Sequence, residues 1–175
     1  FLQPYAANAQ LVKGAMARLS GAPGAGMTLL DALVEPSRGL EKRDGPRAVI
    51  VPVITDGTEF SNRHYRDVVD ALKRSGAALH AVTIGTFATS MAEPIRNRAT
   101  VLDEGPRVTG GQRVSLLTSM AVESALEHLA RELSNQHKVV YGRTESLLQP
   151  ETVTVTVTRP GLTARGTVER RKPGA

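Results

Sequence analysis

Cysteine and tryptophan are absent from this sequence of 175 residues, and aromatic residues make up only 3% of it. The absence of cysteine excludes disulfides, thiolate metal sites and cysteine nucleophiles. The scarcity of aromatic rings argues against a nucleic-acid platform, because base stacking requires exposed rings. The core must therefore be built from Val, Leu, Ile and Ala.

A strong charge of either sign is also missing. The chain has 22 Lys and Arg residues against 17 Asp and Glu residues, which gives a formal net charge of +5. We interpret this excess as solvated surface plus a basic tail from Arg165 to Lys172, with attraction to an acidic polymer or an anionic membrane surface as the alternative. No apolar run approaches the ~20 residues of a membrane span, so we predict no transmembrane segment in this stretch.

An apolar run of strand length, Ala48 to Ile54, stands at the centre of the chain and is followed by Asp56-Gly57. A continuous apolar run indicates a strand buried on both faces, which is typical of parallel sheets covered by helices. Pro52 inside the run predicts a local irregularity, because proline cannot donate a hydrogen bond to a neighbouring strand. Asp56 lies where the chain leaves the sheet, which is the end at which open α/β sheets bind ligands.

Hydrophobic periodicity predicts further helices and strands on both sides of this run. Helices are predicted from Asn8 to Gly21, from Thr28, from Ser61 or Asn62 to Gly76, and over Ser119–Gln136; strands are predicted over Ala77–Gly85 and Gln112–Leu117. The stretch Pro36 to Pro46 is predicted to be a polar connection, and Phe87 to Gly111 to be irregular, with a short helix at Met91–Asn97. A strand, a helix and a strand in succession imply two neighbouring parallel strands and an α/β fold.

From Lys138 onward the pattern changes to a period of two. Lys138–Gly142 and Thr152–Thr158 are predicted strands, and Arg159-Pro-Gly161 turns the second of them into Thr163–Glu169, which predicts an antiparallel hairpin. We therefore divide the chain into an α/β body, residues 1–137, and a C-terminal β extension with a basic tail, residues 138–175.

Asp56 is a candidate ligand for a divalent cation. A carboxylate at the end of a strand, beside the hydroxyls of Thr55 and Thr58, offers the hard oxygen ligands that Mg²⁺ favours. A helix-capping or turn role for Asp56 is the alternative. Thr28 is a weaker second candidate oxygen ligand, because a capping box formed with Asp31 explains it fully.

Other catalytic and metal-binding arrangements have little support in the sequence. No Gly-x-Ser-x-Gly segment is present, and the spacing of the histidines forms no metal pattern, which favours structural or surface roles with satisfied hydrogen bonds. The four histidines are His64, His80, His128 and His137. A pair of carboxylates for acid–base catalysis would have to come from Asp56, Glu59, Asp103 or Glu104, and nothing in the sequence fixes their separation.

Three stretches together carry a family resemblance. Thr28 is followed by Leu-Leu-Asp-Ala-Leu, a later apolar strand ends in Thr55-Asp56-Gly57, and Thr109-Gly-Gly111 precedes a short strand and a long helix. In this order, and with the Arg-Pro-Gly-Leu turn of the tail, they resemble the second half of a von Willebrand factor type A domain, in its bacterial von Willebrand factor A-related subfamily. The resemblance covers most of residues 1 to 169.

The resemblance implies a Rossmann-like, mostly parallel sheet with helices on both faces and a metal-ion-dependent adhesion site at its carboxyl end. Thr28 and Asp56 match the second and third parts of that site. The first part, an Asp-x-Ser-x-Ser stretch after the first strand, has no match, so we expect a domain truncated before Phe1 that lacks its first strands. Because Mg²⁺ requires near-octahedral oxygen ligands, we expect negligible Mg²⁺ affinity for residues 1–175 and measurable affinity for the intact domain.

The function that this resemblance implies is a non-catalytic module for protein binding or adhesion. In the intact protein, Mg²⁺ held partly by Thr28 and Asp56 would bind an acidic group of a protein partner. The resemblance also favours an extracytoplasmic location, either secreted, periplasmic or on the cell surface. Two alternatives stay open: a Mg²⁺-dependent α/β hydrolase or phosphotransfer enzyme that uses Asp56, and a metal-free scaffold that uses the sheet edge and the basic tail.

Overall fold

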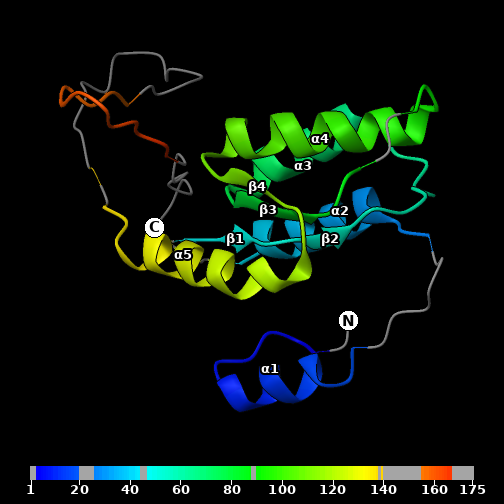
Figure 1. The fold of residues 1–175 in the computed structure, drawn as a ribbon, viewed down its shortest axis with the longest axis horizontal. Helices are drawn as coiled ribbons and strands as arrows, with labels where there is room; N and C mark the ends of the chain where they lie inside the picture. Colours follow the sequence, from blue (N-terminus) through cyan, green and yellow to red (C-terminus); the bar gives the residue numbers. More distant parts are fainter. Residues whose placement is uncertain are drawn as a thin grey trace.

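The structure is a computed structural model that describes residues 3–19, 26–43, 47–87, 90–137, 139 and 155–166. Within these ranges helices alternate with strands, which confirms the predicted α/β class (Figure 1). The helices are α1 (Ala9–Met16), α2 (Leu29–Glu41), α3 (Tyr65–Ser75), α4 (Glu93–Thr109), the 3₁₀ turn η1 (Ser119–Ala121) and α5 (Val122–Ser134). The strands are β1 (Val49–Ile50), β2 (Val53–Thr55), β3 (Ala78–Ile84) and β4 (Gln112–Leu116).

The sheet is organised around β3, which pairs in parallel with each of the other strands. β1 and β2 lie along one edge of β3, with Val53 opposite Val82, and β4 lies along its other edge, with His80 opposite Gln112. The prediction of neighbouring parallel strands joined by a helix is therefore confirmed. The mostly parallel sheet with helices is consistent with a Rossmann-like fold.

β1 and β2 are two pieces of the strand that the sequence predicted over residues 48–54. They are separated at Val51 and Pro52, which confirms the irregularity predicted for the proline, although the Pro52 carbonyl still accepts a hydrogen bond from Val82 N at 2.9 Å. The prediction that both faces are buried is wrong. Ile54 packs against the core, whereas Val51 and Val53 are 38% and 45% exposed. The exposed face is the one that the main helical layer does not cover.

The core lies between the sheet and the layer formed by α2, α3 and α4. Figure 1 shows α3 and α4 on one side of the sheet and α5 on the other. The core residues share one property, near-complete burial of an aliphatic side chain; they are Leu29, Leu30, Leu33, Val34, Val68, Val69, Ala71, Leu72, Leu79, Ala81, Val101 and Leu102. Full burial of such a side chain contributes ~1.5–3 kcal/mol as an upper estimate. This layer therefore supplies most of the apolar stabilisation.

The Thr109-Gly-Gly111 segment joins α4 to β4 by close packing on β3. The Thr109 hydroxyl accepts a hydrogen bond from Leu79 N at 3.0 Å and donates one to the Gly105 carbonyl at 2.7 Å. A Cβ on Gly111 would lie 1.9 Å from the Leu79 carbonyl oxygen, so only glycine fits there. The motif thus has a structural role in holding the end of α4 against the sheet.

The opposite face of the sheet is covered less completely. The predicted helix over residues 119–136 is present as η1 followed by α5, but of its apolar side chains only Leu129 is buried. His80 of β3 belongs to this side, because its partner residue Gln112 donates to Glu132 of α5 at 3.0 Å. α1, with Asn8 as its predicted N-cap, lies apart from the other helices in Figure 1 and exposes most of its apolar residues.

Two segments are more helical than predicted: the stretch Pro36–Pro46, predicted as a polar connection, and Phe87–Gly111, predicted as irregular apart from a short helix at Met91–Asn97 that coincides with the start of α4. α2 continues through Pro36 to Glu41, and α4 runs for 17 residues with Pro106 inside it. Proline normally breaks a helix interior because it removes a hydrogen bond. Here the surrounding turns are held by burial: Ser37 is buried and donates to the Leu33 carbonyl at 2.7 Å, and Val101 is fully buried against the core. Packing has therefore overridden local propensity.

The predicted C-terminal hairpin is not confirmed. Residues 155–158 and 163–166 are described and form no strand, but the predicted turn at Arg159–Gly161 is present, with Leu162 N donating to the Arg159 carbonyl at 3.4 Å. Residues 138, 140–154 and 167–175, which contain the rest of that prediction, lie outside the described residues. The predicted helix stop at Gly21 and most of Lys138–Gly142 also lie outside them. Within the described ranges, no helix is both long enough and apolar enough to cross a membrane.

Candidate functional site

Asp56 and Thr28 lie on two segments that run side by side at the carboxyl end of β2. Met27 N donates to the Thr58 carbonyl at 2.8 Å, and Phe60 N donates to the Met27 carbonyl at 2.8 Å. These two bonds form a parallel bridge between Met27 and Glu59. The loop that precedes α2 and the loop that follows β2 therefore share one rim of the sheet, which we call the β2 rim (residues 26–28 and 56–61).

The Asp56 carboxylate faces an arginine that the sequence analysis did not identify. Arg98 of α4 donates from Nη2 to Asp56 Oδ1 at 3.1 Å; its side chain is only 2% exposed, whereas that of Asp56 is 32% exposed. Nη1 of Arg98 donates to the Gly57 carbonyl at 2.5 Å and contacts the sulfur of Met27 at 3.6 Å, and its guanidinium lies 5.0 Å from the ring centre of Phe87. The buried guanidinium of Arg98 therefore lies directly behind the β2 rim.

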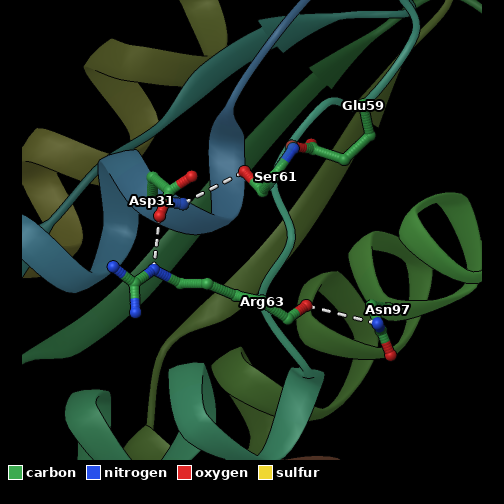
Figure 2. A network of polar contacts seen from close by, with 5 residues as sticks. All are labelled: Asp31, Glu59, Ser61, Arg63 and Asn97. Carbon is green, nitrogen blue, oxygen red and sulfur yellow. Dashed lines mark hydrogen bonds and ion pairs between the residues drawn. The ribbon is translucent and has the colours of Figure 1, made fainter.

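Thr28 is the N-cap of α2, but its side chain makes no capping hydrogen bond. Its backbone has φ −124° and ψ 56°, which differs from the extended conformation that directs an N-cap hydroxyl onto the helix. The capping bond comes instead from the other loop, where Ser61 Oγ accepts from Asp31 N at 3.3 Å (Figure 2). The predicted capping box is therefore wrong, and the exposed Thr28 hydroxyl has no structural role within the helix cap.

Ser61 belongs to a polar network that holds the loop following β2 in place. Figure 2 shows the Asp31 carboxylate paired with Arg63, and the Arg63 carbonyl accepting from Asn97 Nδ2 at 3.2 Å. Because Ser61 caps α2, it does not begin the next helix as predicted. α3 begins at Tyr65, and His64 is its N-cap, with Nδ1 accepting from Arg66 N at 3.3 Å.

Glu59 is the other notable carboxylate of the rim. It is 3% exposed; its Oε1 accepts from Ser61 N at 3.1 Å, whereas its Oε2 is buried and has no hydrogen-bond partner in the structure. Of the remaining acid–base candidates, Asp103 pairs with Arg113 at 2.5 Å on the surface. The described contacts of Glu59 and Asp103 are structural, and they give no support to a catalytic carboxylate pair.

The histidines follow the prediction except at one position. His128 and His137 are exposed, and His64 caps a helix. His80 is buried, but neither of its ring nitrogens has a hydrogen-bond partner in the structure, so the expectation of a satisfied histidine is wrong there. Burial lowers the pKa of His80, the nearby charge of Glu132 raises it in opposition, and Arg165 lowers it further. We expect His80 to be neutral at physiological pH.

The residues of the β2 rim do not by themselves fit a Mg²⁺ ion. Within the described residues, no group of three or more His, Cys, Asp or Glu side chains is placed to hold a metal. Thr28 and Asp56 supply two side-chain oxygen ligands, whereas Mg²⁺ demands near-octahedral coordination. In addition, Arg98 already engages the Asp56 carboxylate.

The sequence matches no protein-family model and no curated protein. The fold and site define the class of the chain only as an α/β domain with a mostly parallel sheet and polar residues at its carboxyl rim. The resemblance to a von Willebrand factor type A domain stays a prediction that rests on the sequence stretches that carry it.

Proposed function

We propose that this chain is a non-catalytic protein-binding module whose contact surface is the β2 rim. The observation that carries the proposal is the pair of hydrogen bonds between Met27 and the Thr58–Phe60 segment, which holds the Thr28 and Asp56 segments next to each other. Both side chains reach the surface at this rim: Thr28 is exposed, and Asp56 is partly exposed despite its contact with Arg98. A partner can therefore contact both of them.

The proposal includes a divalent cation in the intact protein. In this form, which follows the resemblance, Mg²⁺ is held partly by Thr28 and Asp56 and presents an open coordination position to an acidic group of the partner. Oxygen ligands of this kind suit Mg²⁺. The ion needs further ligands from elsewhere in the protein, and it needs the Asp56 carboxylate to turn away from Arg98. The resemblance also favours a location outside the cytoplasm.

The proposal is tested with an array of synthetic peptides, each of which presents one aspartate or glutamate. We expect the intact protein to bind a subset of the peptides in Mg²⁺, and to lose that binding in chelator and in Asp56→Asn. Asp70→Asn, which changes an exposed carboxylate on α3, is the matched control and should bind as the wild type does. Equal binding in Mg²⁺, in chelator and in both variants would contradict a role for the cation and for Asp56.

A Mg²⁺-dependent hydrolase or phosphotransfer enzyme is the alternative from another class. It needs a nucleophile or a second carboxylate that converges on Asp56, whereas the contact described for the Asp56 carboxylate here includes the guanidinium of Arg98. A panel of phosphate and ester substrates distinguishes the two. Turnover by the intact protein that is lost in Asp56→Asn would favour the enzyme.

The metal-free scaffold is the second alternative. It is supported by the exposed valines of the β1–β2 edge and by the basic charge of the chain. Binding that is insensitive to chelator but weakens with rising salt concentration would favour it, because salt screens exposed charges within about 10 Å at 0.1 M.

A further inference from the structure

The C-terminal segment of residues 155–166 contacts the α/β body through Arg165. The guanidinium donates from Nη1 to Gln112 Oε1 at 2.5 Å and from Nη2 to Glu132 Oε1 at 2.6 Å. Gln112 is the first residue of β4, and Glu132 lies in the last turn of α5. Every residue of the segment is exposed except Ala164, which is half-buried. One arginine side chain therefore joins an otherwise exposed segment to the junction of β4 and α5.

The two acceptors of this arginine are held in position by each other. Gln112 Nε2 donates to Glu132 Oε2 at 3.0 Å, so the remaining amide oxygen and carboxylate oxygen both face the guanidinium. An isolated ion pair with side chains that are 38% and 27% exposed would contribute little to stability. Here three side chains form a closed ring of hydrogen bonds. Two fixed acceptors match the planar fork of a guanidinium, whereas the ammonium of lysine is a single point charge.

A buried histidine lies next to this arrangement. His80 of β3 is opposite Gln112 in the register of the sheet, is 2% exposed and has no hydrogen-bond partner on either ring nitrogen in the structure. Burial is the main cause that lowers its pKa, Glu132 of α5 acts in the opposite direction, and the positive charge of Arg165 lowers it further. A neutral His80 does not compete with Arg165 for the Glu132 carboxylate.

We infer that Gln112 and Glu132 form a guanidinium-binding site for an arginine of a polypeptide segment, and that Arg165 is its ligand within this chain. The site goes beyond the proposed function and does not depend on it. Gln112 begins β4, whereas Asp56 follows the end of β2, and the strands are parallel. The guanidinium site and the β2 rim therefore lie at opposite ends of the sheet. Because Arg165 belongs to the same chain, a separate arginine peptide must compete with an intramolecular ligand.

The test removes the internal ligand and offers the site a peptide. The full chain with Arg165→Gln is titrated with a synthetic peptide of residues 160–166, which contains a single arginine and has blocked ends. Nuclear magnetic resonance shifts of the backbone amides of α5 and of the Gln112 side-chain amide report even weak binding. Control peptides carry glutamine or lysine in place of the arginine. Circular dichroism and thermal unfolding verify the fold of each protein.

We expect the Arg165→Gln protein to bind the arginine peptide. The added substitution Glu132→Gln should weaken this binding about tenfold, because it removes a charge-assisted hydrogen bond. Glu127→Gln, which changes an exposed carboxylate of α5, is the matched control and should have no effect. The wild type should bind the peptide more weakly than Arg165→Gln, since its own arginine occupies the site. The lysine peptide should bind more weakly than the arginine peptide, and the glutamine peptide should not bind.

Three results of this titration would overturn the inference. They are the absence of binding to Arg165→Gln, equal binding of the arginine and glutamine peptides, and equal binding with and without Glu132→Gln. Wild-type binding as tight as that of Arg165→Gln would also contradict it, because Arg165 would then not be the ligand.

His80 supplies a second measurement that does not depend on the affinity of a peptide. Arg165→Gln removes a nearby positive charge and leaves the carboxylate of Glu132, so the pKa of His80 should rise. Arg159→Gln removes a charge from an exposed position of the same segment and should leave it unchanged. Addition of the arginine peptide to Arg165→Gln should lower the pKa again. The ring protons of His80, followed against pH by nuclear magnetic resonance, measure these shifts, and an unchanged pKa in Arg165→Gln would overturn the inference.

Discussion

Two arginine–aspartate pairs lie near the β2 rim, and they differ in their access to water. In the pair of Arg98 and Asp56 the side chains are 2% and 32% exposed; in the pair of Arg63 and Asp31 they are 35% and 45% exposed. The chemistry is the same in both. The comparison separates a pair whose arginine is buried from a pair in which water reaches both side chains.

The two pairs differ in energy because an unpaired charge costs more free energy when it is buried than when it is exposed to water. Loss of one partner of a buried ion pair leaves a charge that water cannot reach, whereas an exposed pair is screened and each member is solvated when the other is removed. Arg98 lies against the ring of Phe87 and the core, while Arg63 lies on the loop that leads into α3. The two pairs should therefore respond very differently to the same substitution.

The largest effect is expected for Asp56→Ala. It leaves the buried guanidinium of Arg98 without a countercharge at the rim, so we expect a loss of ~3–5 kcal/mol in the free energy of unfolding. Urea denaturation measures it. Combination with Arg98→Met should recover much of the loss, because the buried charge is then absent. A loss below about 1 kcal/mol for Asp56→Ala would show that Arg98 is solvated after all.

His80 extends the comparison to a buried ionisable group with no hydrogen-bond partner in the structure. Because burial lowers its pKa below the ordinary value of about 6.5, the unfolded chain binds the proton more readily than the folded one. His80 therefore does not reduce the free energy of unfolding above pH 6.5. As the pH falls through that value towards the pKa of the folded state, the free energy of unfolding decreases.

We therefore expect His80→Leu to flatten the loss of stability between pH 7 and pH 5. Since the substitution also removes an unsatisfied polar group, it should raise the free energy of unfolding by ~1–2 kcal/mol. Chemical denaturation over this pH range measures both effects. The control is His128→Leu, an exposed site in α5, which should leave the pH profile unchanged; an equally steep profile in His80→Leu would contradict the prediction.

Substitutions of Ser61 and of Thr28 distinguish helix capping from partner binding at the N-terminus of α2. Ser61→Ala removes the oxygen that accepts from Asp31 N, so it should destabilise the protein by ~1 kcal/mol. Thr28→Ala removes a hydroxyl that makes no capping bond and should leave the stability within ~0.5 kcal/mol of the wild type. Thermal unfolding of the two variants measures the difference, and the reverse order would restore the predicted capping role of Thr28.

The smallest effect is expected at the exposed pair. Arg63→Gln should cost between 0 and about 1 kcal/mol, and less at high salt, because both side chains of the pair are more than a third exposed. Urea denaturation at low and at high salt tests this prediction. A cost comparable to that of Asp56→Ala would abolish the distinction between the two pairs.

The parts of the fold that follow from local pattern were predicted from the sequence. The buried strand β3, the irregularity at Pro52 and the position of Asp56 at the end of β2 are examples. They depend on runs of apolar residues and on backbone chemistry that neighbours in the sequence determine.

The parts that depend on packing between distant residues could not be predicted in the same way. Most of α4 looked irregular because it contains Gly105 and two prolines, and since the predicted short helix ended at Asn97, Arg98 was missed. Its spacing of three and four residues from Val101 and Leu102 is the signal that would have placed it on the buried face. The cap that Ser61 provides to α2 joins residues 30 apart, and no local pattern indicates it.

Thr28→Ala is the most direct test of the central claim, because the substitution should leave both the fold and the Arg98–Asp56 pair intact. The measurement is the binding of the intact variant to the carboxylate-bearing peptides in Mg²⁺, compared with the wild type at equal thermal stability. We expect the variant to lose the Mg²⁺-dependent binding. Wild-type binding by a folded Thr28→Ala protein, unchanged by chelator, would contradict the claim that the β2 rim recognises its partner through a cation held by Thr28 and Asp56.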